Sequence, residues 1–195
     1  TLKATADFVG FVGMEDFDIS ATDLTVEINR GIPGIGAAAD VVIDHGLRQI
    51  EVLTGPGSTI ALDSDGSLGE LTRASGNLSI NAFNFGTLQG FLAVEKSSQS
   101  VTLASGEVVA VDSLTVGGGN LGAFVGINGG SDDAIGVELT GAEFGLAMFT
   151  SKADATRTWI SLEATANSMS FTGIDGLTLA GTSLQVSINQ AGKLN

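Results

Sequence analysis

The chain repeats part of its own sequence, and this internal repeat constrains its fold more than any other feature. Residues 2–30 align without a gap to residues 162–190, and 11 of these 29 positions are identical. Several other positions exchange similar residues, such as Asp7 for Asn167. A gapless match with the same apolar phase predicts that residues 1–160 form one long β-repeat and that residues 161–195 begin the next copy.

A shorter pattern runs inside the long repeat, in which a small residue and a polar one precede apolar residues at every second position. Strict alternation over four to eight residues rich in Val, Ile, Leu and Phe predicts half-buried strands and an all-β fold. The alternating segments are residues 21–28, 39–43, 58–62, 76–80, 90–94, 119–124, 142–148 and 182–188.

The spacing of these segments favours an elongated β-solenoid, a β-helix-like repeat of stacked coils. The first apolar residues of the early segments are Leu24, Val41, Ile60 and Leu78, which follow one another at nearly regular intervals. A single coil leaves two edges unpaired and cannot bury its apolar face, so its stability comes from its neighbours. Tandem β-sandwich repeats are the alternative, in which Asn and Gly mark hairpin turns.

Several of the expected strands end in an Asn or Asp that follows Ile. Asn and Gly tolerate the positive φ angles that tight turns require, and Gly follows within three residues in most cases. These positions are therefore predicted to be structural corners, namely Asn29, Asp44, Asn81, Asn128 and Asn189.

Charge and composition exclude several classes of protein. With 22 acidic residues against 8 basic ones, the net charge of −14 disfavours nucleic-acid binding, which needs clustered Lys and Arg. The absence of Cys excludes disulfide scaffolds and thiolate metal sites. No run of about 18 apolar residues is present, so no transmembrane segment is expected.

Two acidic turns are candidate calcium sites. In the first, Asp63, Asp65 and Glu70 surround a Gly turn, and calcium binds six to eight oxygen ligands of this kind. The second turn, with Asp132 and Asp133, is weaker. Solvated turns are the alternative interpretation of both, and no cofactor is required.

The residues that commonly carry catalysis are sparse. His45 is the only His and is expected at a corner, and the glycine-rich residues 31–36 lack the Lys of a phosphate loop. Glu15 and Asp16 form a carboxylate pair without a nearby basic residue. The chain is therefore not expected to be an enzyme, and a polysaccharide-cleaving β-helix is a remote alternative.

Residues 173–189, which read GIDGLTLAGTSLQVSIN, resemble repeats of giant acidic, cysteine-free bacterial surface or adhesin-like proteins of the β-solenoid type. The resemblance implies an extracellular or cell-surface location and a structural function, as a spacer, filament or matrix component. The implied partners are neighbouring repeats of the same chain or identical chains joined end to end. A calcium-dependent adhesin repeat, or one that binds a glycan or another surface ligand, is the alternative.

Overall fold

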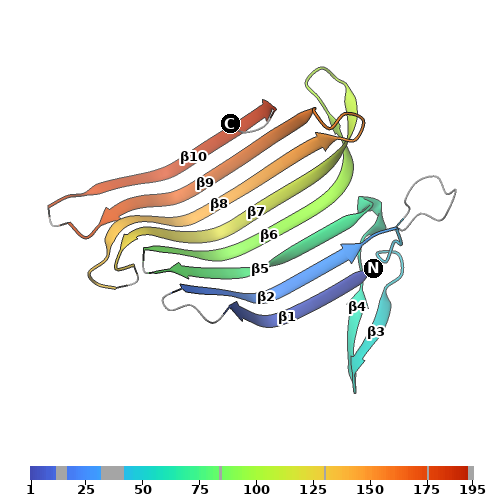
Figure 1. Ribbon diagram of the computed structural model, residues 1–195, viewed down its shortest axis with the longest axis horizontal. Coiled ribbons are helices and arrows are strands. Elements are labelled where there is room, and N and C mark those ends of the chain that lie inside the picture. The colour runs from blue at the N-terminus through green and yellow to red at the C-terminus, as the bar shows by residue number, and fades with distance from the viewer. Residues whose placement is uncertain (12–16, 32–41, 84, 130, 175, 193–195) are drawn as a thin grey trace.

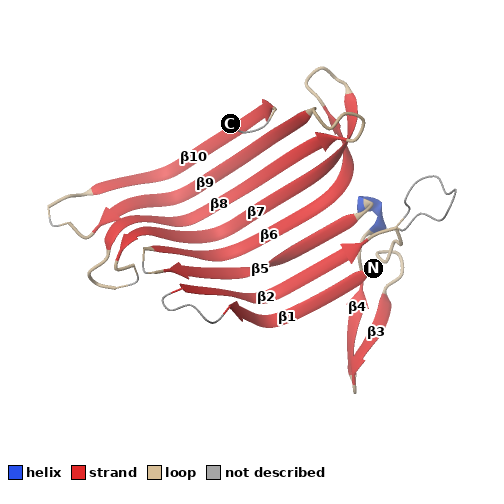
Figure 2. Ribbon diagram, in the orientation of Figure 1, coloured by secondary structure: helices blue, strands red, loops and turns tan. Residues whose placement is uncertain are grey.

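The computed structural model describes residues 1–11, 17–31, 42–83, 85–129, 131–174 and 176–192. Within these residues the fold is all-β, as the alternating pattern predicts, and the one helical element is the short 3₁₀ turn η1 (Gly66–Leu68) (Figure 2). The strands are β1 (Leu2–Phe11), β2 (Phe17–Asn29), β3 (Ile50–Gly55), β4 (Ser58–Leu62), β5 (Leu71–Ala82), β6 (Gly86–Thr102), β7 (Val108–Ile127), β8 (Ile135–Ser151), β9 (Thr158–Thr172) and β10 (Leu179–Ala191).

Eight of these strands form one open, curved sheet in the order β1-β2-β5-β6-β7-β8-β9-β10 (Figure 1). Every neighbouring pair is antiparallel, and β1 and β10 form the two edges. The hairpin β3–β4 comes between β2 and β5 in the chain and projects away from the main sheet (Figure 1).

Stacked coils are not found in the part of the chain that the structure describes. Successive coils of a parallel β-helix place strands side by side in the same direction, whereas here each strand of the main sheet pairs antiparallel with its neighbours. The β-solenoid is therefore unconfirmed. The sandwich alternative is also unconfirmed, because the second sheet contains only β3 and β4 among the described residues.

Most of the predicted alternating segments lie on strands. Residues 58–62 coincide with β4, and residues 21–28, 76–80, 90–94, 119–124, 142–148 and 182–188 lie within longer strands of the main sheet. Residues 39–41 of the remaining segment lie outside the described residues. Alternation thus located seven of the ten described strands, missed β1, β3 and β9, and underestimated the length of most of those that it found.

The two faces of the main sheet differ in polarity. One row of cross-strand partners is wholly apolar and consists of Ala4, Val26, Ala74, Val94, Val116, Leu146, Leu162 and Ile188. The adjacent row points to the opposite face and is mainly polar: Lys3, Glu27, Arg73, Glu95, Thr115, Ala147, Ser161 and Asn189. An antiparallel sheet with one apolar face buries that face against another surface.

Residues with positive φ lie inside five strands of the main sheet. They are Asp23, Gly90, Asn120, Gly141 and Ser183, with φ angles of 53°, 139°, 49°, 56° and 56°. Beside the first four, the register with a neighbouring strand shifts, as at a bulge. A bulge inserts one residue and reverses which positions face a given side. In β8, Phe144 comes five positions after Leu139, an odd offset that would place the two side chains on opposite faces of a regular strand. Both nevertheless pack against the same buried cluster. The bulges therefore keep apolar side chains on one face along the full length of the strands.

One buried apolar cluster lies beside this line of bulges. Leu121, Ala142 and Ala166, from β7, β8 and β9, are its buried members. Leu88, Leu92, Leu139, Phe144 and Leu184 pack around them and stay partly exposed. The other buried apolar side chains are those of Leu71, Val109, Val111, Phe124 and Ile160. Much of the apolar face is thus only half covered by the sheet itself.

Candidate functional site

The hairpins at the two edges of the sheet, β1–β2 and β9–β10, share one register. Leu2 lies opposite Ile28, and Leu162 lies opposite Ile188, which is the same pairing between the aligned residues of the second copy. The correspondence holds as far as the pairing of Phe11 with Ile19 and of Phe171 with Leu179. The internal repeat of the sequence is therefore also a repeat of strand pairing.

The same side-chain hydrogen bond occurs near the end of each hairpin. The Thr1 hydroxyl donates to Asn29 Oδ1 at 2.9 Å, and the Ser161 hydroxyl donates to Asn189 Oδ1 at 3.2 Å. Thr1 and Ser161 stand immediately before the two aligned segments. This pair was not predicted from the sequence, although the hydroxyl residues Thr1 and Ser161 at equivalent positions were the available signal.

The surroundings of the two Asn residues differ. Asn29 is 1% exposed, and its Nδ2 donates to the Ile43 carbonyl at 2.8 Å. Asn189 is exposed, and its side-chain bond with Ser161 leaves Nδ2 without an acceptor among the described residues. The contrast follows from the position of the strands, because β5 and residues 42–46 cover β2, whereas β10 pairs only with β9 in the described part of the chain.

A buried polar cluster joins the first hairpin to the segment that precedes β5. His45 is 2% exposed, its Nε2 lies 3.0 Å from Thr1 Oγ1, and its backbone N–H donates to the Ser64 carbonyl at 2.9 Å. Since Thr1 gives its hydroxyl proton to Asn29, His45 Nε2 is the donor in this contact. Ser64 in turn donates to Glu27 at 2.7 Å. The arrangement is that of a structural His holding a connecting segment in place.

A hollow of about 430 Å³ lies on the apolar face and extends from β6 to β10. Its lining includes the side chains of Leu121, Leu139, Phe144 and Leu184. An apolar surface of this kind is typical of contact with another apolar group.

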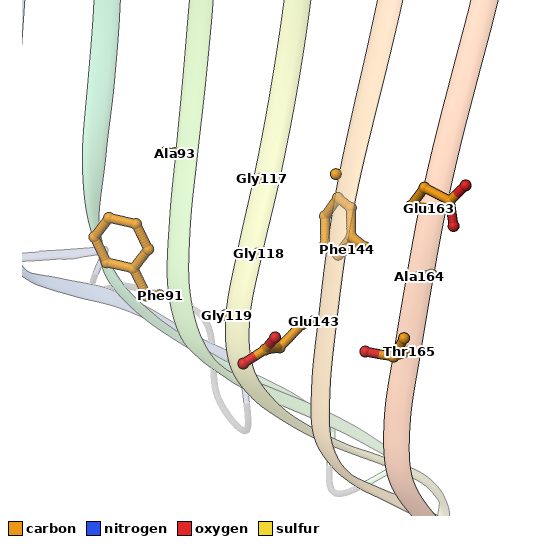
Figure 3. Close-up of a pocket in the computed structure, with 11 residues that line it drawn as sticks. Phe91, Ala93, Gly117, Gly118, Gly119, Glu143, Phe144, Glu163, Ala164 and Thr165 are labelled. Carbon is orange, nitrogen blue, oxygen red and sulfur yellow. The ribbon is translucent and has the colours of Figure 1, made fainter. Parts of the chain in front are cut away.

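A second hollow, of about 500 Å³, lies on the opposite face (Figure 3). Gly117, Gly119 and Gly145 contribute no side chains to its floor, and Phe91 and Glu143 stand beside it (Figure 3). Glu163 and Thr165 complete its far side. No Lys, Arg or His lines this hollow among the described residues, so its carboxylates lack the basic neighbour expected in a polysaccharide-cleaving site.

The predicted calcium residues of the first acidic turn have protein partners. Asp63 accepts from Lys3 Nζ at 2.6 Å. Asp65 caps the turn η1 by accepting from the Ser67 backbone N–H at 2.8 Å, and hydrogen bonding by Ser67 lowers the pKa of Asp65. Glu70 follows the turn, and within the described residues it is not grouped with Asp63 and Asp65 closely enough to hold a metal ion.

The second acidic turn, with Asp132 and Asp133, is exposed. In the part of the chain that is described, no three His, Asp or Glu side chains are grouped closely enough to hold a metal ion. The calcium site stays a prediction from the sequence.

The predicted corners occupy different positions. Asn29 ends β2, and Asn128 follows β7 with a φ of 56°. Asp44 accepts from the backbone N–H groups of Gly46 and Gly66 at 3.0 and 3.1 Å. Asn81 and Asn189 lie inside β5 and β10 instead, close to the ends of these strands.

Two candidate sites considered from the sequence lie wholly or largely outside the described residues. They are the carboxylate pair Glu15 and Asp16, and residues 32–36 of the glycine-rich segment.

Comparisons with known proteins give no relative for this chain. No protein-family model, no curated protein and no solved structure matches it. Among the residues described, no helix is both long and apolar enough to span a membrane.

Proposed function

We propose that this chain is a structural repeat segment of an extracellular bacterial surface or fibre-forming protein, where it acts as a spacer, filament or matrix component. The observation that carries the proposal is the shared register of β1–β2 and β9–β10 at opposite edges of one sheet. The hairpin β9–β10 pairs with β8 of the first copy and is itself the first hairpin of the next copy, so it joins both copies in one sheet.

The dimensions of such an array follow from the topology. The main sheet has eight strands, of which β9 and β10 repeat β1 and β2, so six strands belong to each copy of the repeat. Strands in a sheet lie about 4.8 Å apart, so each copy lengthens the array by about 29 Å. Neighbouring copies satisfy each other's backbone groups, which is how repeat proteins become stable and elongated.

The acidic composition suits a long array, because the net charge of −14 opposes association between arrays. The extracellular setting is proposed from the resemblance to giant acidic surface proteins.

Chains with one, two and three copies of residues 1–160, each ending in residues 161–195, test the proposal. We expect the melting temperature to rise with copy number and the maximum dimension in small-angle X-ray scattering to grow by about 29 Å per copy. Equal melting temperatures together with no regular increase in length would refute a structural array.

A further inference from the structure

The strand β10 is the counterpart of β2 but lacks one of its neighbours. β2 pairs with β1 on one side and with β5 on the other, where Val26 lies opposite Ala74 and Ile28 opposite Thr72. β10 carries the same residues as Val186 and Ile188 but pairs only with β9 among the described strands. Its second edge is open.

Three of the identities between β2 and β10 are apolar residues at every second position. Leu24, Val26 and Ile28 recur at Leu184, Val186 and Ile188 on the apolar face. The positions between them, which face the polar side, differ. Thr25, for example, is replaced by Gln185. The second copy has therefore kept the side chains that would continue the apolar rows into a further strand.

The Asn189 amide repeats a contact of Asn29 in part. Its Oδ1 already accepts from Ser161, as Asn29 Oδ1 accepts from Thr1. Asn29 uses its Nδ2 to donate to the Ile43 carbonyl, in the segment between β2 and β3. The corresponding Nδ2 of Asn189 has no acceptor within the described residues. The Nδ2 group can therefore donate to a carbonyl of a neighbouring copy, as Asn29 donates to Ile43.

The sequence of β10 also lacks the usual protection of an edge strand. Edge strands commonly carry charges or Pro, which prevent other strands from pairing with them. β10 has 13 residues, LAGTSLQVSINQA, without a charged residue or Pro. β1, at the opposite edge, contains Lys3 and Asp7. An uncharged edge of this length is a surface for strand addition.

From these observations we infer that the open edge of β10, with Asn189 near its end, is the docking surface for the following copy of this same repeat. That copy adds a strand equivalent to β5 along β10, and it adds a segment equivalent to Ile43–Gly46, whose first carbonyl accepts from Asn189 Nδ2. The inference rests on the proposed function and names the surface through which the array grows.

The test uses an extended chain in which residues 1–190 are followed directly by residues 31–195. In this chain β9–β10 of the first copy takes the place of β1–β2 in the second. One further change, Glu163→Lys, gives the Asp63 of the added copy the cation that Lys3 provides within one copy. The original 195-residue chain with Glu163→Lys is the reference.

Two measurements are made on both chains. Hydrogen exchange is expected to slow at least about tenfold at those β10 amides that point away from β9, because a new strand covers them. Asn189→Ala is expected to lower the melting temperature of the extended chain as Asn29→Ala lowers that of the reference, and to leave the reference chain almost unchanged. Gln185→Ala is the matched control. Gln185 is an exposed side-chain amide of the same strand, and the equivalent residue in β2 is Thr25, which is not an amide.

Unchanged exchange in β10, or an Asn189→Ala variant as harmless as Gln185→Ala in the extended chain, overturns the inference. If stability and length still increase with copy number, the array forms through another surface and the proposed function survives. A second variant covers the case in which the extended chain does not fold. In this variant of the original chain, residues 161–190 replace residues 1–30, except that Lys is kept at position 3. We expect it to fold with the transplanted Asn buried, and its failure to fold also overturns the inference.

Discussion

Three consecutive glycines in β7 distinguish the two faces of the sheet by direct substitution. Gly117, Gly118 and Gly119 point alternately to opposite faces, as strand residues do. A Cβ on Gly118 would meet the ring of Phe144 and lie 2.7 Å from Leu121 Cδ1, whereas a Cβ on Gly119 meets nothing within 4 Å. We therefore expect Gly118→Ala to destabilise the fold and Gly119→Ala to leave it unharmed.

The size of the difference follows from the packing around the two sites. Leu121 is 6% exposed and belongs to the buried cluster, so it moves only at a cost. Inserting one methyl group into a packed site destabilises by about 1–3 kcal/mol. At an open site, Gly→Ala stabilises by about 0.4–1 kcal/mol, because the unfolded chain loses conformational freedom. The two variants should therefore differ by about 1.4–4 kcal/mol in the free energy of unfolding.

Urea unfolding followed by the fluorescence of Trp159, the only Trp, measures this difference. Gly145→Ala in β8 is a second control, because a Cβ there also meets nothing within 4 Å. Equal unfolding free energies for Gly118→Ala and Gly119→Ala would show that Phe144 and Leu121 do not pack over β7, and the assignment of the apolar face would be wrong.

Three further predictions concern the hairpin ends, the loops and the acidic turn. Asn29→Ala should cost about 1–3 kcal/mol in thermal or chemical unfolding and Asn189→Ala less than about 0.5 kcal/mol, because only Asn29 is buried with both hydrogen bonds made. The Arg157 hydrogen bonds lower the pKa of Glu107, so its stabilisation is complete above the ordinary Glu pKa of about 4.3 and is lost as the pH falls through the lowered value. Glu107→Gln should therefore flatten the pH dependence of the melting temperature between about pH 3 and 5, and an unchanged profile would contradict this. Excess calcium should shift the melting temperature little, because Lys3 already pairs with Asp63, the first carboxylate of the turn. A large upward shift would instead support calcium binding at this turn.

The sequence predicted seven of the ten described strands, because alternation reports only that one side of a segment is buried. It carries no information on the direction of the neighbouring strand. A strand with its turn and one coil of a solenoid both recur at similar intervals along a chain, so the nearly regular spacing of the early segments does not separate them. The antiparallel direction of neighbouring strands is seen only in the structure, for example in the pairing of β5 with β6.

Bulges explain why the strands were expected to be short. β7 runs for 20 residues, yet only residues 119–124 were recognised in it. The glycines before that segment and Asn120 within it are typical of a turn, but Asn120 is a positive-φ residue inside the strand. Local sequence cannot distinguish a bulge from a turn, since the difference lies in whether the partner strand continues past it.

The candidate site was predictable in its residues but not in its contacts. The Ile-Asn pattern identified Asn29 and Asn189, and their different burial depends on β5, a strand that comes much later in the chain than Asn29. The partner of Asp63 is Lys3, which is 60 residues away in the chain. The calcium prediction could not include this ion pair, because sequence spacing shows only neighbours within one loop.

Equivalent positive-φ residues lie at the same point in both copies of the repeat. Asp23 and Ser183 occupy equivalent positions in the two aligned segments, are not Gly, and have φ angles of 53° and 56°. Each lies in the second strand of its hairpin, where the register with the first strand continues without a shift. Against β5, by contrast, the register of β2 shifts between Thr22 and Thr25, as at a bulge. If the following copy pairs with β10 as β5 pairs with β2, we expect the same shift between Thr182 and Gln185. The apolar side chains of successive copies would then stay on one face of the sheet.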